Sequence, residues 1–427
     1  MANSAEAIFD RKDGEYDHRE VQCVLCKGSR MLCGKSSCPI LVKYYSVLKS
    51  KPLLDVLNMD GTSPPGVFVG RMGYPYVSIG PLIPPIHGDT EILDTPELWY
   101  GKGINEIVDF RSQLVRGKFR TNVLNVNSGG KIVDLTRELA LSSNPTEVEA
   151  EFTKKPAGRL LLNDDVPPYG PSAPLKKLDV GNLKIDQRIE RAYYDDDLNA
   201  RGAVVSLYNN NILVSRIQKG FSVGAFGIGK HRRLVPTRWS ITAVDSILSL
   251  ELMKKIKLFN TVDEYRVYES VQLDNRWEVL MMPENWCYEL VEAWYPSTVW
   301  NPNGNSIVIF SDHEKFEGRT TYAQIGGCYY AARLAVGELL LKERRQAGVV
   351  ILREAHPGYI MPVGVWNVRE NVRASLKNPP KKFDTMQKVL DYVSTKLDIP
   401  VKRWIHHSAI LQDSIYQKRI SDYATMQ

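Results

Sequence analysis

Four cysteines near the N-terminus constrain this chain more than any other feature of its sequence. Cys23, Cys26, Cys33 and Cys38 lie within sixteen residues. Four thiolates hold a zinc ion tetrahedrally without any other ligand, and a Cys-x-x-Cys pair supplies two of them from one tight turn. The spacing therefore predicts a structural zinc module. An iron–sulfur cluster, which also takes four cysteines, is an alternative, and disulfides are a weaker one because nothing else in the chain indicates secretion.

The composition is that of an ordinary globular protein. The chain has 427 residues, of which 43% are hydrophobic and 24% are charged, which leaves room for two or three domains or for one large domain with appendages. A net charge of +6 permits nucleic-acid binding without requiring it. The first residues contain no apolar signal-peptide region, and no run approaches the roughly 18 apolar residues of a membrane span. We therefore expect a cytoplasmic protein.

The hydrophobic pattern mixes helices and strands without strict alternation. This mixture predicts an α+β fold, or an α/β fold with a mixed sheet. The expected helices cover residues 39–58, 96–116, 240–257, 322–345 and 383–397. The expected strands are 67–69 and 76–79 as a hairpin, two strands within 203–216, and further strands within 262–282, 306–311 and 349–368.

The remaining segments suggest the domain organisation. The proline-rich stretch 154–182 predicts a long loop or linker, and the last fifteen residues predict a polar tail. We therefore divide the chain into a zinc module at 15–45, a core in two parts at 46–290 and 291–408, and a flexible tail at 409–427.

A glycine-rich basic stretch at 222–240 is the first candidate for chemistry. Glycine lets backbone N–H groups approach a phosphate, and arginine binds phosphate bidentately. The spacing matches neither a Walker A loop nor a dinucleotide fingerprint, and an ordinary basic surface loop is the alternative. Thr237 or Ser240 is expected to cap the helix that follows. The expected phosphate contacts are Lys230, His231, Arg232, Arg233 and Arg238.

Three other arginines join this set of expected phosphate contacts. Arg111 and Arg116 lie near the end of an expected helix, where a basic patch and salt bridges are equally plausible interpretations. Arg319 follows an acidic cluster and precedes the helix at 322–345.

That acidic cluster is the candidate catalytic site. Asp312, His313, Glu314 and Glu317 follow an expected strand. Such residues could hold Mg²⁺ or Mn²⁺ for phosphodiester hydrolysis, and His313 could instead act as an acid or base. The alternative is a solvated turn with a helix-capping carboxylate. A weaker candidate is the strand end at Arg353, Glu354 and His356.

The C-terminal stretch Gln417-Lys-Arg-Ile-Ser-Asp-Tyr-Ala424 fits a sliding-clamp-binding peptide. Ile420 and Tyr423 would fall on one side of a short helical turn and enter a hydrophobic pocket of the clamp, while Gln417 would anchor the peptide by hydrogen bonds. Ala424 replaces the second aromatic residue of the pattern, which should weaken binding.

Several of these stretches together resemble one family, the archaeal Nre DNA-repair proteins of the NreA type. The resemblance spans almost the whole chain. It implies a role in DNA-damage repair close to the nucleoid, a zinc-finger-like N-terminus and partnership with the sliding clamp (PCNA), but no settled catalytic residue. The residues that carry it are the four cysteines, Gly70-Arg-Met-Gly-Tyr-Pro75, Arg111-Ser-Gln-Leu-Val-Arg-Gly117, Ser222-Val-Gly-Ala-Phe-Gly227, Leu234-Val-Pro-Thr-Arg-Trp-Ser240, Phe316-Glu-Gly-Arg-Thr-Thr-Tyr322 and the terminal peptide.

Several functions are compatible with these features. The leading hypothesis is a repair factor that binds DNA and is recruited by the clamp, either as a metal-dependent nuclease or as a non-catalytic binder of DNA structures or nucleotides. An enzyme acting on a nucleotide or phosphorylated metabolite and an RNA-processing factor are the alternatives from other classes.

Overall fold

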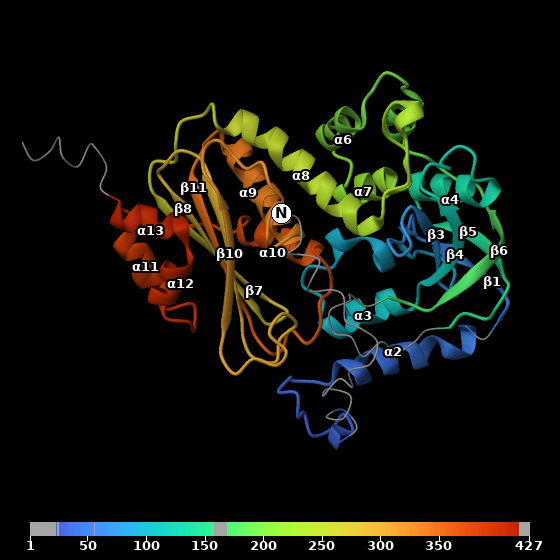
Figure 1. Cartoon of the computed structure of the whole chain (residues 1–427), viewed down its shortest axis with the longest axis horizontal. Helices are drawn as coiled ribbons and strands as arrows, with labels where there is room; N and C mark the ends of the chain where they lie inside the picture. The colour runs from blue at the N-terminus through green and yellow to red at the C-terminus, as the bar shows by residue number, and fades with distance from the viewer. Residues whose placement is uncertain (1–22, 24, 55, 158–168, 418–427) are drawn as a thin grey trace, which may run out of the picture. The chain divides into compact units, whose positions relative to one another are not determined.

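The computed structural model describes residues 23, 25–54, 56–157 and 169–417, and the chain divides into two compact units (Figure 1). We call the part made of residues 39–253 and 362–370 the N-sheet unit, and the part made of residues 1–38, 254–361 and 371–427 the C-sheet unit. Each unit combines helices with a mixed six-stranded sheet, so the expected α+β class is confirmed. No helix in the described part of the chain is long and apolar enough to cross a membrane.

The sheet of the N-sheet unit is built from neighbours in space that are distant in sequence. Its strand order is β1-β5-β6-β4-β3-β2, and only the β4–β6 pair is parallel. The strands are β1 (Asn58–Ser63), β2 (Val67–Val69), β3 (Tyr76–Ile83), β4 (Val115–Asn122), β5 (Thr146–Phe152) and β6 (Ser172–Val180).

Alternating burial along these strands produces the core of the N-sheet unit. In β5, Val148, Ala150 and Phe152 face the same way and are buried together with Leu139. Leu139 belongs to α4, which therefore covers that face of the sheet. The helices of this unit are α2 (Pro39–Leu54), α3 (Ile104–Ser112), α4 (Lys131–Leu141), α5 (Gln187–Tyr194), α6 (Ala200–Asn209), α7 (Val214–Ser222) and most of α8 (Thr237–Ile256), with short 3₁₀ turns at Glu91–Asp94, Pro96–Leu98 and Gly229–His231.

The sheet of the C-sheet unit has the order β10-β9-β11-β8-β7-β12, with β9 and β11 parallel. Its strands are β7 (Tyr265–Gln272), β8 (Asn275–Met282), β9 (Cys287–Trp294), β10 (Val308–Glu314), β11 (Gly348–Ala355) and β12 (Lys381–Phe383). Its helices are α9 (Gly327–Glu343), the end of α10 (Trp366–Ser375), α11 (Met386–Ser394), α12 (Val401–His407) and α13 (Ala409–Tyr416).

Helices cover both faces of this second sheet (Figure 1). Tyr288 of β9 donates its hydroxyl to the backbone of α9 at 3.0 Å, whereas the next residue, Glu289, accepts backbone N–H groups at the start of α13. Because successive side chains of a strand point to opposite faces, α9 and α13 lie on opposite sides of the sheet.

Most of the expected elements are confirmed. The hairpin appears as β2 and β3, which pair antiparallel, and the helices expected at 39–58, 240–257, 322–345 and 383–397 appear as α2, α8, α9 and α11. Among these four helices α11 is strongly amphipathic, whereas α2, α8 and α9 are recognisable as long segments rich in apolar residues.

The two strands expected within 203–216 are wrong, because this segment forms α6 and α7. The β-branched pair Val204 and Val205 favoured strands. Local capping and burial override that preference: the side chain of Asn199 accepts the N–H of Gly202 at 2.8 Å, and Val204 is buried with Leu207 one turn ahead.

Two further expectations need correction. The helix expected at 96–116 is only α3, and Val115 already begins β4. The loop expected at 154–182 contains β6, whose Ala173 and Leu175 are buried in the sheet core, while 158–168 lie outside the described residues. Helix α13 also extends to Tyr416, into the expected polar tail.

Candidate nucleic-acid interface

Exposed aromatic and basic side chains gather at the tip of the β2–β3 hairpin in the N-sheet unit. Met72 is 83% exposed, Tyr74 47%, Tyr76 54% and Trp239, at the start of α8, 46%. Exposed arginines accompany them from the same elements and from the adjoining loop. We call this group the hairpin-tip surface; it consists of Arg71, Met72, Tyr74, Tyr76, Arg120, Arg233, Arg238 and Trp239.

Backbone and side-chain contacts join the three segments that form this surface. The hydroxyl of Thr237 accepts the N–H of Val69 at 2.8 Å, which ties the start of α8 to β2. The N–H of Val123 donates to the carbonyl of Pro75 at 2.9 Å, and the Val123 carbonyl accepts the N–H of Leu234 at 2.8 Å. The ring centroids of Tyr74 and Trp239 are 5.2 Å apart. Segments near residues 72, 122 and 236 therefore meet at one place.

Arg120 lies directly against the hairpin turn. Gly73 has a φ of +79°, and a Cβ built there would lie 3.3 Å from the Arg120 guanidinium. Arg120 pairs across the sheet with Ser78, and Tyr76 with Asn122, so Arg120 and Tyr76 are diagonal neighbours on one face.

The same face of β4 carries a row of cations. Arg116, Lys118 and Arg120 alternate along the strand, so their side chains share one face at a spacing of about 6.6 Å, twice the rise per residue. Among the described residues, no carboxylate pairs with Arg116, Lys118 or Arg120. Burial and the neighbouring Arg116 charge lower the pKa of Lys118. A row of unneutralised cations is the electrostatic arrangement that attracts a polyanion.

Arg116 is held in place by stacking. Its guanidinium lies 3.7 Å from the ring centroid of Tyr169 and 5.6 Å from that of Phe68. Burial lowers the pKa of Arg116, and its Nε, although buried, has no hydrogen-bond partner within the described segments. Arg116 therefore belongs to the row of β4 cations, whereas Arg111 forms an ion pair with Asp94.

The glycine-rich stretch supplies the other edge of the surface. Gly224 has a φ of +70°, and a Cβ there would lie 2.7 Å from the Arg233 carbonyl, so only glycine fits this close approach. Lys230, His231, Arg233 and Arg238 are exposed. Arg232 instead donates to the carbonyls of Gly227 and Tyr193 at 2.7 and 2.5 Å and thereby fixes the loop.

The expected helix cap takes a different form. Helix α8 begins at Thr237, whose hydroxyl accepts from Val69, and the Ser240 hydroxyl donates to the carbonyl of Gln218 at 2.5 Å. These two hydroxyls therefore fix the helix start against β2 and α7 rather than capping it.

The aromatic half of this surface and part of its charge were not predicted from the sequence. Arg71, Tyr74, Tyr76, Lys118, Arg120 and Trp239 were not among the expected site residues. One sequence signal could have revealed them: the stretches 67–83, 115–130 and 222–244 contain eight lysines and arginines and no aspartate or glutamate. Acid-free basic stretches with interspersed aromatics are typical of nucleic-acid surfaces.

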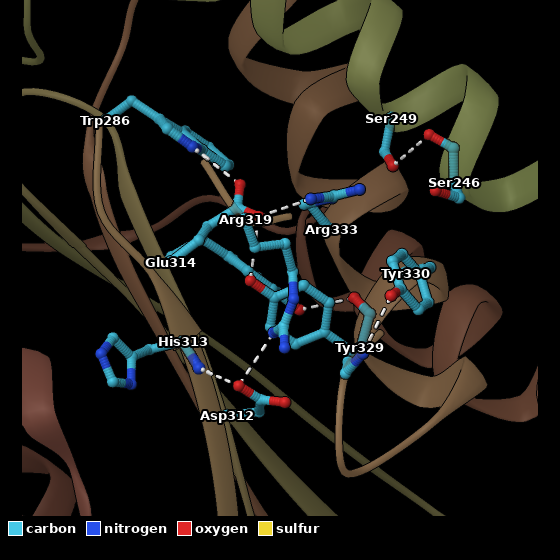
Figure 2. A network of polar contacts seen from close by, with 12 residues as sticks. Ser246, Ser249, Trp286, Asp312, His313, Glu314, Arg319, Tyr329, Tyr330 and Arg333 are labelled. Carbon is cyan, nitrogen blue, oxygen red and sulfur yellow. Dashed lines mark hydrogen bonds and ion pairs between the residues drawn. The ribbon is translucent and has the colours of Figure 1, made fainter. Parts of the chain in front are cut away.

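The four candidate catalytic residues lie in the C-sheet unit, and Figure 2 shows three of them, Asp312, His313 and Glu314. In the described part of the chain, none of the four belongs to a set of three ligand groups close enough to share a metal ion. Glu314 is 3% exposed and forms a 2.5 Å ion pair with the fully buried Arg333. Its carboxylate also accepts the indole N–H of Trp286 at 3.1 Å and the hydroxyl of Tyr329 at 3.0 Å. These contacts engage both oxygens of Glu314.

The other three residues differ in environment. Asp312 shares a face of β10 with Glu314 and forms a 2.8 Å ion pair with Arg319. Arg319, an expected phosphate contact, is therefore paired with a carboxylate and is not part of the hairpin-tip surface. His313 points to the opposite face, and Glu317 is exposed in the following turn. The arrangement resembles a structural ion-pair network more than an open metal site.

The cysteine segment forms the tight turns that its spacing suggested. The N–H of Lys27 donates to the Cys23 carbonyl at 3.0 Å, and that of Arg30 to the Cys26 carbonyl at 3.2 Å. The N–H group of Leu32 is the largest influence that lowers the pKa of Cys26, which favours the thiolate that binds metal. Four thiols on such turns suit zinc by donor chemistry.

One set of three candidate ligand groups within 4.8 Å of each other occurs among the described residues: Glu354, His356 and Asp398. Glu354 accepts the N–H groups of Asp398 and Ile399, and Asp398 pairs with Arg276 at 2.6 Å. These contacts within the fold explain why the carboxylates of Glu354 and Asp398 lie where they do.

Of the expected clamp-binding residues, only Gln417 is described. Its N–H donates to the Asp413 carbonyl at 3.0 Å and ends α13. Ile420 and Tyr423 lie outside the described residues.

Comparison with known proteins identifies relatives over most of the chain. Residues 32–301 match the family model "Archaeal Nre, N-terminal", and residues 314–423 match "Archaeal Nre, C-terminal". The chain is 40% identical to DNA repair protein NreB of Archaeoglobus fulgidus, over 92% of this chain and 97% of that protein. It is 38% identical to NreA of the same organism, over 88% and 94%, and 35% identical to NreA of Haloferax volcanii, over 84% and 88%.

No solved structure matches the chain. The two family models together match most of the residues between 32 and 423, and the matched relatives are covered over most of their length. This chain belongs to the archaeal Nre family.

Proposed function

We propose that this protein acts in DNA repair by binding DNA on the hairpin-tip surface and the adjoining row of β4 cations. The relatives carry the printed name DNA repair protein. The observation that supports a DNA contact is the convergence of three acid-free basic segments, in which Arg71, Lys118 and Arg120 have no carboxylate partner among the described residues. When cations placed in this way bind phosphates, the counterions condensed on the DNA are released, which favours binding.

Salt titration tests this proposal directly. Binding of fluorescein-labelled DNA should weaken steeply as salt rises, with a slope of log K against log salt of about −0.7 for each phosphate contact on a single strand. The double variant Lys118→Ala/Arg120→Ala should lose about 1.4 from the magnitude of that slope.

The matched control is Lys382→Ala/Lys388→Ala, which removes the same charge from the other unit. Both lysines are exposed and already pair with Glu264 and Asp384 at 2.8 Å. The control should bind DNA as the wild type does. Absence of DNA binding at 50 mM salt, or equal slopes for both double variants, would refute the proposal.

A second part of the proposal concerns recruitment. The stretch from Gln417 onward follows α13, so a clamp-binding peptide would begin where the helix ends. Ile420→Ala/Tyr423→Ala should abolish binding to purified sliding clamp and leave DNA affinity unchanged, whereas Gln412→Ala, within α13, should bind the clamp normally. Clamp binding that survives the tail substitution would contradict this part.

The third part is a structural zinc ion on Cys23, Cys26, Cys33 and Cys38. Zinc would tie the turns of the N-terminal segment together, and its chemistry there would be purely structural. The proposal includes no cleavage step, because Asp312 and Glu314 are already engaged by arginines.

A further inference from the structure

Tyr74 and Trp239 form a pair of exposed aromatic rings on the hairpin-tip surface. Tryptophan and tyrosine rings are normally largely buried, yet these two are 47% and 46% exposed, beside the 54% exposed Tyr76. Their ring centroids are 5.2 Å apart with an interplanar angle of 52°. A cluster of exposed aromatics marks a contact site rather than a random surface feature.

The rings are positioned by well-connected backbone. In the hairpin turn, the N–H of Tyr76 donates to the Gly73 carbonyl at 2.9 Å, and that of Gly70 to the Ser78 carbonyl at 2.7 Å. Trp239 lies in the first turn of α8, which Thr237 ties to β2. Because two anchored elements present the rings, little conformational entropy is lost when a flat ligand stacks on them.

Charge decides which flat ligand fits. Arg71, Arg120 and Arg238 are exposed close to the rings, on segments without any acidic residue. A hydrophobic peptide would gain nothing from these arginines, whereas a strand of nucleotides offers a phosphate for each cation and a base face for each ring. Intact duplex DNA keeps its base faces stacked inside the helix, so only unpaired bases could use the aromatic part of the surface.

We propose that Tyr74 and Trp239 form a base-stacking platform for unpaired nucleotides, which makes single-stranded DNA or an unpaired region in damaged DNA the preferred ligand. This inference rests on the proposed function, since it names the DNA form that the hairpin-tip surface recognises. Stacking of one base on an aromatic side chain changes affinity by about 5- to 150-fold on alanine substitution.

The test compares a labelled single strand with a hairpin duplex of the same sequence, by fluorescence anisotropy on the full chain. Trp239→Ala should lower single-strand affinity by about 5- to 150-fold and duplex affinity less than about twofold, with the salt slope unchanged because no phosphate contact is lost. Trp239→Phe keeps a ring and should restore most of the affinity. The matched control is Trp300→Ala, which removes a 42% exposed tryptophan of the C-sheet unit and should change neither affinity.

Each other outcome is informative. Equal losses on single strand and duplex, or no loss on either, would overturn the platform while the proposed DNA binding stands. Tighter binding of RNA of the same sequence would overturn the assignment to DNA. No binding of either DNA form by the wild type would refute the proposed function itself. Circular dichroism of Trp239→Ala and Trp239→Phe separates loss of the ring from loss of the fold.

Discussion

Removal of the Glu314 carboxylate tests whether the acidic cluster on β10 serves the fold or a reaction. In Glu314→Ala, Arg333 loses its ion-pair partner at a site where both side chains are at most 1% exposed. Breaking such a buried pair from one side costs about 3–5 kcal/mol. The indole N–H of Trp286 and the hydroxyl of Tyr329 also lose their acceptor, each at about 1–3 kcal/mol, so the loss should fall at the upper end of the first range.

The assay is thermal unfolding of the full chain followed by circular dichroism. For a unit of about 200 residues, each kcal/mol lowers the melting temperature by about 2–4 °C. We therefore expect the transition of the C-sheet unit to fall by an amount on the order of 10 °C. The matched control, Glu317→Ala, removes the same group from an exposed turn and should shift the transition by less than about 2 °C.

A compensating variant sharpens the result. Glu314→Met/Arg333→Met replaces both charges by apolar groups and should recover most of the lost stability, because neither partner is left buried alone. The structural explanation is refuted if Glu314→Ala melts like the wild type and abolishes a divalent-metal-dependent cleavage of DNA. That pair of results would make the carboxylate part of a nuclease site.

Three further predictions can be checked independently. Cys23→Ser should reduce the zinc content of purified protein measured by mass spectrometry, and should lower stability without affecting clamp binding; unchanged zinc content would exclude the cysteine site. Burial and the nearby Glu269 raise the pKa of Glu278 to about 8, so Glu278 holds a proton in the fold that it loses in the unfolded chain. The free energy of unfolding should therefore fall as pH rises from about 4.5 to about 8, by up to about 1.4 kcal/mol per pH unit, and urea titrations of Glu278→Gln should lack this contribution. Gly224→Ala should displace Arg233, because its Cβ would meet the Arg233 carbonyl, and should weaken DNA binding in the same anisotropy assay; wild-type affinity would show that the loop tolerates the change.

The fold class and the regular helices could be predicted from local pattern alone. Helices α8 and α9 are long segments rich in apolar residues, and the β2–β3 hairpin has glycine and proline turn residues between two short apolar runs. In these segments local preference and tertiary burial agree, so the local sequence is sufficient. In α6 they disagree, because β-branched residues favour a strand while the Asn199 cap and the surrounding core favour a helix.

The candidate sites also differ in how far the local sequence predicts them. Residue type and spacing along one short stretch were enough to propose zinc on four cysteines and a clamp peptide at the tail, since such sites depend on neighbours in sequence. Whether a charged residue is available depends on what tertiary folding places beside it. In the sequence, nothing distinguishes Glu314 and Arg319 from charged residues on a surface. In the fold, Arg333 forms an ion pair with Glu314, and Asp312 forms one with Arg319.

The hairpin-tip surface is the clearest case of what only the tertiary structure decided. The sequence by itself determined that the chain has basic, acid-free stretches and exposed turn residues, because composition and turn chemistry are local properties. It could not determine that the rings of Tyr74 and Trp239, 165 positions apart in the chain, lie with their centroids 5.2 Å from each other. That contact depends on the pairing of β3 with β4 and on the hydrogen bond between Val69 and Thr237, which are non-local interactions that form only when the whole unit has folded.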